Sequence, residues 1–191
     1  MDTPSRPLLP VGLLLLTGGA SRRYGAPKHL EPHPRGGTWG SHLVRVFRET
    51  LGPGPERVLG EALPEHPEVA VLEDPREGPA AALVRWAGVE RVQALRWWVV
   101  PCDQVHWTRE FLEDWHRAAA AADPRGDFWV AAETEQGRQV LGGFLGGRLP
   151  PALARLRFRR VGELFGALPS LTRPWAWAPF EDVDERPPTP P

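Results

Sequence analysis

Lysine is nearly absent from this chain of 191 residues, because only Lys28 among the 23 Lys and Arg residues is a lysine. Asparagine and isoleucine are missing altogether. All three have A/T-rich codons, so the pattern suggests a G/C-rich genome that uses arginine wherever charge alone matters. A retained lysine then indicates a need for a compact ammonium on a flexible stem in place of a planar guanidinium. The alternative, which composition alone leaves open, is that Lys28 is a surface residue retained by chance.

Cysteine and net charge are also scarce. Cys102 is the single cysteine, which excludes an internal disulfide and fits a reducing cytoplasm. The formal net charge is −1, whereas a dedicated nucleic-acid or membrane-surface binder needs a basic excess. We therefore expect a cytoplasmic protein with no nucleic acid and no membrane among its partners.

Long apolar runs are lacking as well. The run at residues 8–16 is interrupted by Pro10 and Gly12 and lacks a small-x-small cleavage site. It falls far short of the roughly 20 residues that span a bilayer, so a buried strand is the better interpretation. The length, with 41% hydrophobic and 25% charged residues, suits one globular domain, expected at residues 1–185. The proline-rich residues 186–191 resemble an unstructured tail.

Strand patterns alternate with helix patterns over the first 120 residues. The expected strands there are residues 11–17, 56–59, 69–72 and 95–100, and the expected helices are 41–51 capped by Ser41, 80–92, and one capped by Thr108 that runs to 122. Beyond them we expect strands at 127–132 and 140–145, then short helices at 151–156 and 161–168.

This alternation predicts an α/β fold with a doubly wound, mostly parallel sheet and helices on both faces. In such sheets the ligand crevice lies beyond the carboxyl ends of the strands, where the strand order reverses. The segments that follow residues 11–17 and 95–100 are therefore the candidate site.

The first of these segments is a glycine-rich loop that ends at Lys28. Gly18 and Gly19 leave their backbone N–H groups open to a polyphosphate, and Arg23 and Lys28 could neutralise different phosphates. The loop matches neither the Walker A motif nor the dinucleotide fingerprint. Phosphate binding is the favoured interpretation, with a plain structural turn as the alternative.

The second segment is Pro101-Cys102-Asp103. A carboxylate at the carboxyl end of a strand, facing a phosphate loop, is well placed to hold Mg²⁺, which takes one or two carboxylates plus phosphate oxygens. A turn cap is the alternative role for Asp103. Cys102 and His106 make no metal site by themselves, because two ligands are too few.

Three further aspartates could lie nearby. Asp182 and Asp184 are two residues apart, which places them on one face of an expected strand at residues 180–184. Most such pairs are solvated edge residues. Asp74 follows the strand at residues 69–72 and could line the same crevice or simply begin a turn.

The segment from Leu16 to Lys28 resembles the signature loop of the molybdenum cofactor guanylyltransferases, the MobA-like nucleotidyltransferases. Residues 73–75, residues 78–83 and Pro101-Cys102-Asp103 resemble the later landmarks of that family in order. Residues 180–184 fall where the family has phenylalanine followed by an Asn-x-Asn pair, so the resemblance extends over residues 13–184.

Particular positions within this resemblance bear on nucleotide choice. The Gly18-Gly19 pair resembles guanine-transferring members, since related cytidylyltransferases tend to have alanine-glycine there. The chain departs from the family pattern at Tyr24, where methionine is usual, and at Pro27, where aspartate is common. Asp182 and Asp184 stand in place of asparagines.

The resemblance implies a Rossmann-like nucleotidyltransferase fold and an enzyme that transfers GMP from GTP to molybdopterin with release of pyrophosphate. Mg²⁺ is the implied cofactor. Client molybdoenzymes or cofactor chaperones stay open as further partners. The alternatives are transfer from CTP to molybdopterin, transfer from a nucleotide to a sugar or other phosphate, and a non-catalytic molybdenum cofactor carrier.

The resemblance also assigns roles to individual residues. Asp103 would hold the metal, and Asp182 and Asp184 would lie near the metal or the pterin. The implied catalytic residues are Lys28, Arg23 and Asp103, and the implied nucleotide-binding residues are Thr17, Gly18, Gly19, Lys28, Asp74 and Asp103.

Overall fold

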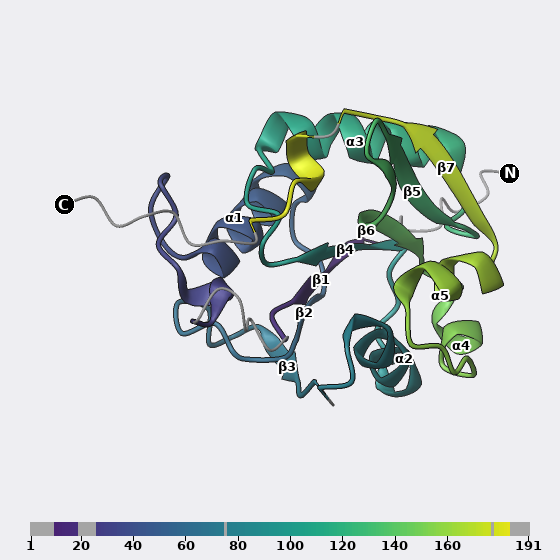
Figure 1. Cartoon of the computed structure of the whole chain (residues 1–191), viewed down its shortest axis with the longest axis horizontal. Helices are drawn as coiled ribbons and strands as arrows, with labels where there is room; N and C mark the ends of the chain where they lie inside the picture. The colour runs from purple at the N-terminus through teal and green to yellow at the C-terminus, as the bar shows by residue number, and fades with distance from the viewer. Residues whose placement is uncertain (1–9, 19–25, 75, 177, 184–191) are drawn as a thin grey trace, which may run out of the picture.

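A single mixed sheet organises the protein in the computed structural model, which describes residues 10–18, 26–74, 76–176 and 178–183. The strand order in this part of the chain is β3-β2-β1-β4-β6-β5-β7 (Figure 1). The strands are β1 (Val11–Leu16), β2 (Glu56–Leu59), β3 (Ala70–Leu72), β4 (Arg96–Pro101), β5 (Trp129–Thr134), β6 (Gly137–Gly146) and β7 (Ser170–Pro174). The helices are α1 (Trp39–Leu51), α2 (Pro79–Val89), α3 (Arg109–Ala122), α4 (Pro150–Leu153) and α5 (Val161–Ala167), with 3₁₀ turns η1 (Lys28–Leu30) and η2 (Ala178–Phe180).

The sheet is mostly parallel, as expected from the sequence. β1 pairs in parallel with β2 and β4, β2 with β3, and β5 with β7, whereas β6 runs antiparallel to both β4 and β5. The chain winds outward from β1 to β3 and then returns to place β4 on the other side of β1. The point where the strand order reverses therefore lies between β1 and β4.

Helices cover both faces of the sheet, with α1 and α3 above it and α2, α4 and α5 below it in Figure 1. In β1, Leu13 and Leu15 pack into the core on the α1 and α3 side, while Leu14 and Leu16 pack into the opposite core. This double burial explains why β1 is a continuous apolar run, because strands buried on both faces do not alternate with polar residues.

The first long helix begins earlier than expected. Thr38, in an extended backbone conformation, caps α1 by accepting a hydrogen bond from the N–H of Ser41 at 3.2 Å. The expectation that Ser41 is the cap was wrong, because Ser41 is buried inside the first turn and its hydroxyl meets His66 Nε2 at 3.0 Å. Thr108 caps α3 as expected, accepting from the N–H of Phe111.

The C-terminal part of the described chain departs most from the sequence expectations. The short edge strand β7 was not expected, and the strand expected at residues 180–184 was wrong over its described part. Pro179 lies in the 3₁₀ turn η2, where its fixed φ and missing N–H are tolerated, and residues 181–183 have no regular structure. Phe180 anchors this turn, since it is fully buried against the edge of Trp107.

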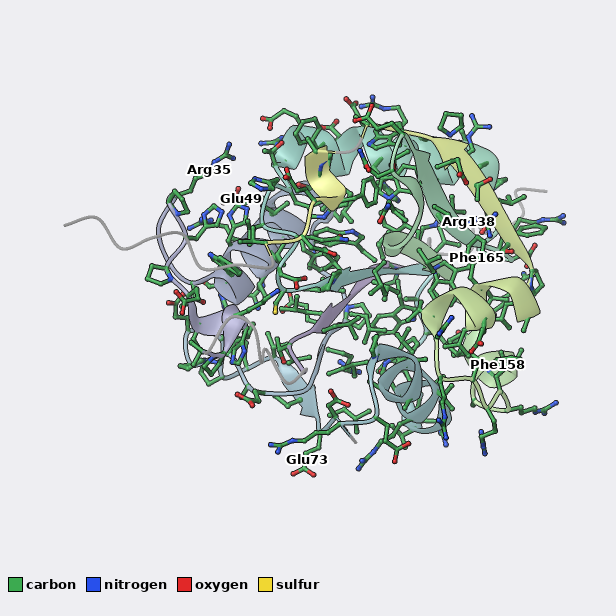
Figure 2. The ribbon with its side chains drawn as sticks, in the orientation of Figure 1. Arg35, Glu49, Glu73, Arg138, Phe158 and Phe165 are labelled. Carbon is green, nitrogen blue, oxygen red and sulfur yellow. The ribbon has the colours of Figure 1, made fainter. Side chains whose placement is uncertain are left out.

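Side chains fasten the helices to the sheet. Figure 2 shows Arg138 of β6 beside Phe165 of α5, and the guanidinium carbon lies 5.3 Å from the ring centroid. A cation over an aromatic face is attracted by the ring quadrupole, so this contact helps to hold α5 on the sheet.

None of the helices within the described ranges has the length and apolar character required to cross a membrane.

The backbone carbonyl of Gly142 joins two buried tryptophans. It accepts hydrogen bonds from Trp98 Nε1 at 3.1 Å and from Trp115 Nε1 at 3.0 Å. Gly142 has a φ of 84°, and a Cβ there would lie 2.7 Å from Gln104 Oε1 and from the Phe180 ring. A side chain at this position would therefore strain the backbone and displace its neighbours.

We predict that Gly142→Ala lowers the free energy of unfolding by about 2–4 kcal/mol, since backbone strain and overpacking act together. The measurement is urea denaturation followed by tryptophan fluorescence. Gly162→Ala is the matched control, because a Cβ at Gly162 of α5 meets only open space. The control should change the same free energy by less than about 1 kcal/mol. Equal stabilities of the two variants would contradict the prediction.

Candidate active site

The carboxyl ends of β1 and β4 lie side by side at the centre of the sheet (Figure 1). Leu16 is paired with Pro101, and the N–H of Cys102 donates to the carbonyl of Leu16 at 3.0 Å. Thr17 directly follows Leu16, and Asp103 lies two residues after Pro101, so both are brought to the same edge. This is the switch point where doubly wound sheets bind ligands.

Lys28 and Asp103 contact each other at this edge. The Lys28 Nζ lies 2.8 Å from Asp103 Oδ2, and the two side chains are 10% and 21% exposed. Lys28 begins η1, whose turn is closed by a hydrogen bond from the N–H of Leu30 to the carbonyl of Pro27. The structure therefore brings together the residue predicted to bind phosphate and the residue predicted to hold the metal.

A small apolar cluster supports this pair. Trp39 at the start of α1 packs with Val105, and Ala26 and Val183 pack against them. Val183 also donates its N–H to the carbonyl of Asp103 at 3.2 Å. The C-terminal segment of the described chain is in this way held beside the carboxyl end of β4.

The charges of this site affect the pKa of Cys102. The pKa of its thiol is raised to about 12, mainly by burial and also by the carboxylates of Asp103 and Asp182, whereas the ammonium of Lys28 acts to lower it. Asp182 is exposed, and its electrostatic effect on Cys102 shows that it lies in the same neighbourhood. The thiol therefore stays protonated at neutral pH in the metal-free protein.

Gly18 lies directly against Asp74. A Cβ at Gly18 would collide with the Asp74 carboxylate, so only glycine allows this approach. The Asp74 Oδ1 also accepts from the N–H of Arg76 at 2.8 Å. Asp74 therefore begins a turn, and it also lies against the first glycine of the loop; its role toward a ligand stays a prediction. Its neighbour Glu73 is exposed and points away from the protein (Figure 2).

The expectation that the backbone N–H of Gly18 is open to a polyphosphate was wrong, because this N–H donates to the carbonyl of Leu59 at 3.1 Å. Amides that bind phosphate are therefore expected from Gly19 onward. Gly19, Arg23 and Asp184 lie outside the described residues, and their predicted roles stay predictions.

Thr17 is fastened to Glu61, a residue that the sequence analysis did not single out. The Thr17 hydroxyl donates to the Glu61 carbonyl and accepts from the Glu61 N–H, both at 2.8 Å. These bonds tie the end of β1 to the turn after β2. They position the loop, which leaves the hydroxyl engaged within the protein. The sequence predicted strands at residues 11–17 and 56–59, and it is their pairing in the structure that brings this turn to the end of β1.

The donor set suits a hard divalent cation with further ligands from a substrate. Asp103 offers carboxylate oxygens, which such cations prefer. Within the described ranges, no three His, Cys, Asp or Glu residues are grouped closely enough to hold a metal ion by themselves.

Comparison with known proteins identifies this arrangement. Residues 13–170 match the family model of the MobA-like NTP transferase domain, which is most of the chain. The chain belongs to the MobA-like NTP transferase domain family. Its members act on nucleoside triphosphates, so this protein is a nucleotidyltransferase. No curated protein sequence matches it significantly.

Solved structures share the fold of this MobA-like domain. Rv0371c of Mycobacterium tuberculosis superimposes with a TM-score of 0.68 at 20% identity, covering 92% of this chain and 94% of that chain. Another structure of Rv0371c is a complex with manganese, with a TM-score of 0.61 at 19% identity and coverage of 88% and 89%.

Two further neighbours differ in their named activities. Molybdopterin-guanine dinucleotide biosynthesis protein A of Archaeoglobus fulgidus has a TM-score of 0.58 at 16% identity, covering 85% of this chain and 83% of that chain. The 2-C-methyl-D-erythritol 4-phosphate cytidylyltransferase of Thermus thermophilus has a TM-score of 0.60 at 14% identity, with coverage of 89% and 91%. At these identities the similarity shows the fold alone.

We predict that Cys102 of this MobA-like domain reacts with iodoacetamide at pH 8 at least about a hundredfold more slowly in the native protein than in urea. The raised pKa and the burial of the thiol both suppress the reactive thiolate in the folded state. Mass spectrometry of the alkylated fraction over time measures both rates. Similar rates in the native and unfolded protein would contradict the assigned environment of Cys102.

Proposed function

We propose that this nucleotidyltransferase transfers GMP from GTP to molybdopterin and releases pyrophosphate. The observation that carries the proposal is the contact of Lys28 with Asp103 at the edge where the strand order reverses and where β1 leads into the glycine loop. An ammonium, a carboxylate and a glycine loop at one point suit a triphosphate accompanied by a divalent cation.

In this proposal the positive side chains neutralise the leaving group. Lys28 and Arg23 contact the β- and γ-phosphates, and the amides from Gly19 onward hold phosphate oxygens. Asp103 fits a divalent cation, Mg²⁺ in the proposal, because its carboxylate offers oxygen donors at the crevice. Such a cation supplies charge neutralisation at the phosphates when it is bound. Asp182 and Asp184 lie on the metal or pterin side.

The reaction needs no general base from the protein. The nucleophile is the terminal phosphate of molybdopterin, a monoester whose second pKa is about 6, so it is largely ionised at pH 7. One of its oxygens forms a bond to the α-phosphorus of GTP while the bond from that phosphorus to the bridging oxygen breaks. The electron pair of that bond leaves with pyrophosphate. The contribution of the protein is alignment and charge neutralisation.

Asp74 supports guanine as the base. Guanine presents two adjacent donors, N1–H and N2–H₂, to which one carboxylate can bind through both oxygens. Cytosine presents a single exocyclic donor beside two acceptors, which a carboxylate would repel. Asp74 lies against Gly18 at the end of β3, on the side of the crevice away from Asp103. We therefore place the base near Asp74 and the metal near Asp103.

Lys28→Ala and Asp103→Ala should each lower the turnover number for pyrophosphate release about a hundredfold or more, because each removes a charge that acts on the phosphates. Continuous detection of pyrophosphate with GTP, Mg²⁺ and molybdopterin measures the effect. Arg117→Ala and Asp114→Ala are matched controls, since these residues form an exposed ion pair of 2.7 Å on α3. Near-normal release by either site variant would remove the mechanism.

Transfer from CTP is the second candidate, favoured by the cytidylyltransferase fold neighbour. We expect GTP with Mg²⁺ to raise the melting temperature by roughly 5–10 °C at a hundredfold excess over its dissociation constant, and CTP to raise it far less. Pyrophosphate release across four nucleotides, with molybdopterin or a sugar phosphate as acceptor, completes the comparison. A larger increase in melting temperature and faster pyrophosphate release with CTP would identify CTP, in place of GTP, as the donor. Absence of pyrophosphate release from every nucleotide would contradict the proposed transfer and favour the non-catalytic carrier.

A further inference from the structure

We propose that Lys28 occupies the metal-binding carboxylate of Asp103 in the resting protein and releases it only when a nucleoside triphosphate accepts the ammonium. Asp103 then binds a divalent cation strongly only in the presence of nucleotide. The proposal rests on the proposed function, because it concerns the order in which the same site is filled.

Geometry makes the two uses of Asp103 compete. The Lys28 ammonium lies 2.8 Å from Asp103 Oδ2. A Mg²⁺ ion would bind an oxygen of this carboxylate at about 2.0–2.1 Å. The ion would therefore lie close to the ammonium, and both positive charges would share one carboxylate with limited solvent to screen them. Each cation therefore weakens the binding of the other.

A triphosphate relieves this competition. It carries several negative charges into the crevice, so it offers the ammonium a stronger partner than the single carboxylate. The Coulomb attraction grows with the charge of the anion. Once the Lys28 side chain turns to the phosphates, the Asp103 carboxylate becomes available, and Asp182 adds negative charge nearby.

The backbone on both sides of the contact is held in place, which confines the exchange to side chains. The residue before Asp103, Cys102, donates its N–H to the carbonyl of Leu16. The carbonyl of Asp103 accepts from the N–H of Val183. Lys28 lies at the start of η1, directly after Pro27. The four-carbon stem of lysine can swing the ammonium from carboxylate to phosphate without moving either segment.

The choice of lysine is consistent with a releasable contact. Arginine would grip the carboxylate with two parallel hydrogen bonds, which is harder to release than a single ammonium contact. Apart from Lys28, all Lys and Arg residues of the chain are arginines. A permanent ion pair would be served equally well by arginine, whereas an exchangeable one favours lysine.

Manganese binding in the absence of nucleotide tests the proposal, with the free Mn²⁺ ion measured by electron paramagnetic resonance. Lys28→Met should bind Mn²⁺ at least tenfold more tightly than the unaltered protein, because the carboxylate is no longer occupied. Lys28→Arg should bind it as weakly as the unaltered protein or more weakly. Arg117→Gln, which removes an exposed positive charge on α3, should leave the affinity unchanged. Adding Asp103→Asn to Lys28→Met should abolish the gain.

The second arm adds a GTP analogue with a methylene group between the α- and β-phosphorus atoms. The unaltered protein should then bind Mn²⁺ at least tenfold more tightly than without the analogue, after subtraction of binding to the analogue alone. The gain should be smaller in Lys28→Met. Circular dichroism and the melting temperature of each variant establish that it is folded.

Two results would overturn the exchange. One is a folded Lys28→Met that binds Mn²⁺ no more tightly than the unaltered protein, and the other is equal Mn²⁺ affinity of the unaltered protein with and without the analogue. The proposed function is judged separately by pyrophosphate release. An enzyme that transfers GMP normally while failing these binding tests loses only the exchange. A protein that passes them without transferring GMP keeps the exchange and loses the proposed acceptor reaction.

Discussion

The parallel pairing of β1 with β4 is the constraint on which the candidate active site depends. It places Leu16 opposite Pro101, so the glycine loop and Asp103 leave the sheet at the same edge. Both strands are buried on both faces, and a slip of one residue would exchange the two side-chain sets between the cores. The position of Asp103 relative to the loop is therefore determined largely by the apolar packing of these two strands.

The sequence was sufficient for the central architecture, because β1 is a continuous apolar run, β4 is apolar after Arg96, and helix patterns separate the two. It was insufficient for β7, a short strand at the sheet edge whose residues are largely exposed and which ends in Pro174. The strand expected around Asp182 was wrong, because its only support was the two-residue spacing of Asp182 and Asp184. Such a short pattern is weak evidence for a strand next to Pro179. The contact of Lys28 with Asp103 spans 75 positions, and motif reading assigned the two residues to separate ligands.

Histidines near the crevice serve the structure and take no part in the chemistry that we propose. Burial lowers the pKa of His42 to about 4, and its ring stacks on His33 with 3.7 Å between centroids. His29, next to Lys28, is also buried, and its pKa is lowered mainly for that reason. These neutral rings fit a reaction whose nucleophile is already ionised, since such a reaction gains nothing from a proton relay.

The charge pattern of the site explains why a cation is needed there before any substrate arrives. Asp103 and Asp182 both raise the pKa of Cys102, which means that two carboxylates act on one small region. Like charges at a partly buried edge repel each other. This repulsion disfavours the contact of the C-terminal segment of the described chain with the end of β4. Lys28 opposes that repulsion in the resting protein. A triphosphate adds further negative charge, so Lys28 cannot neutralise both the nucleotide and Asp103. A divalent cation that accompanies the nucleotide restores the balance, which links metal binding to substrate binding through charge alone.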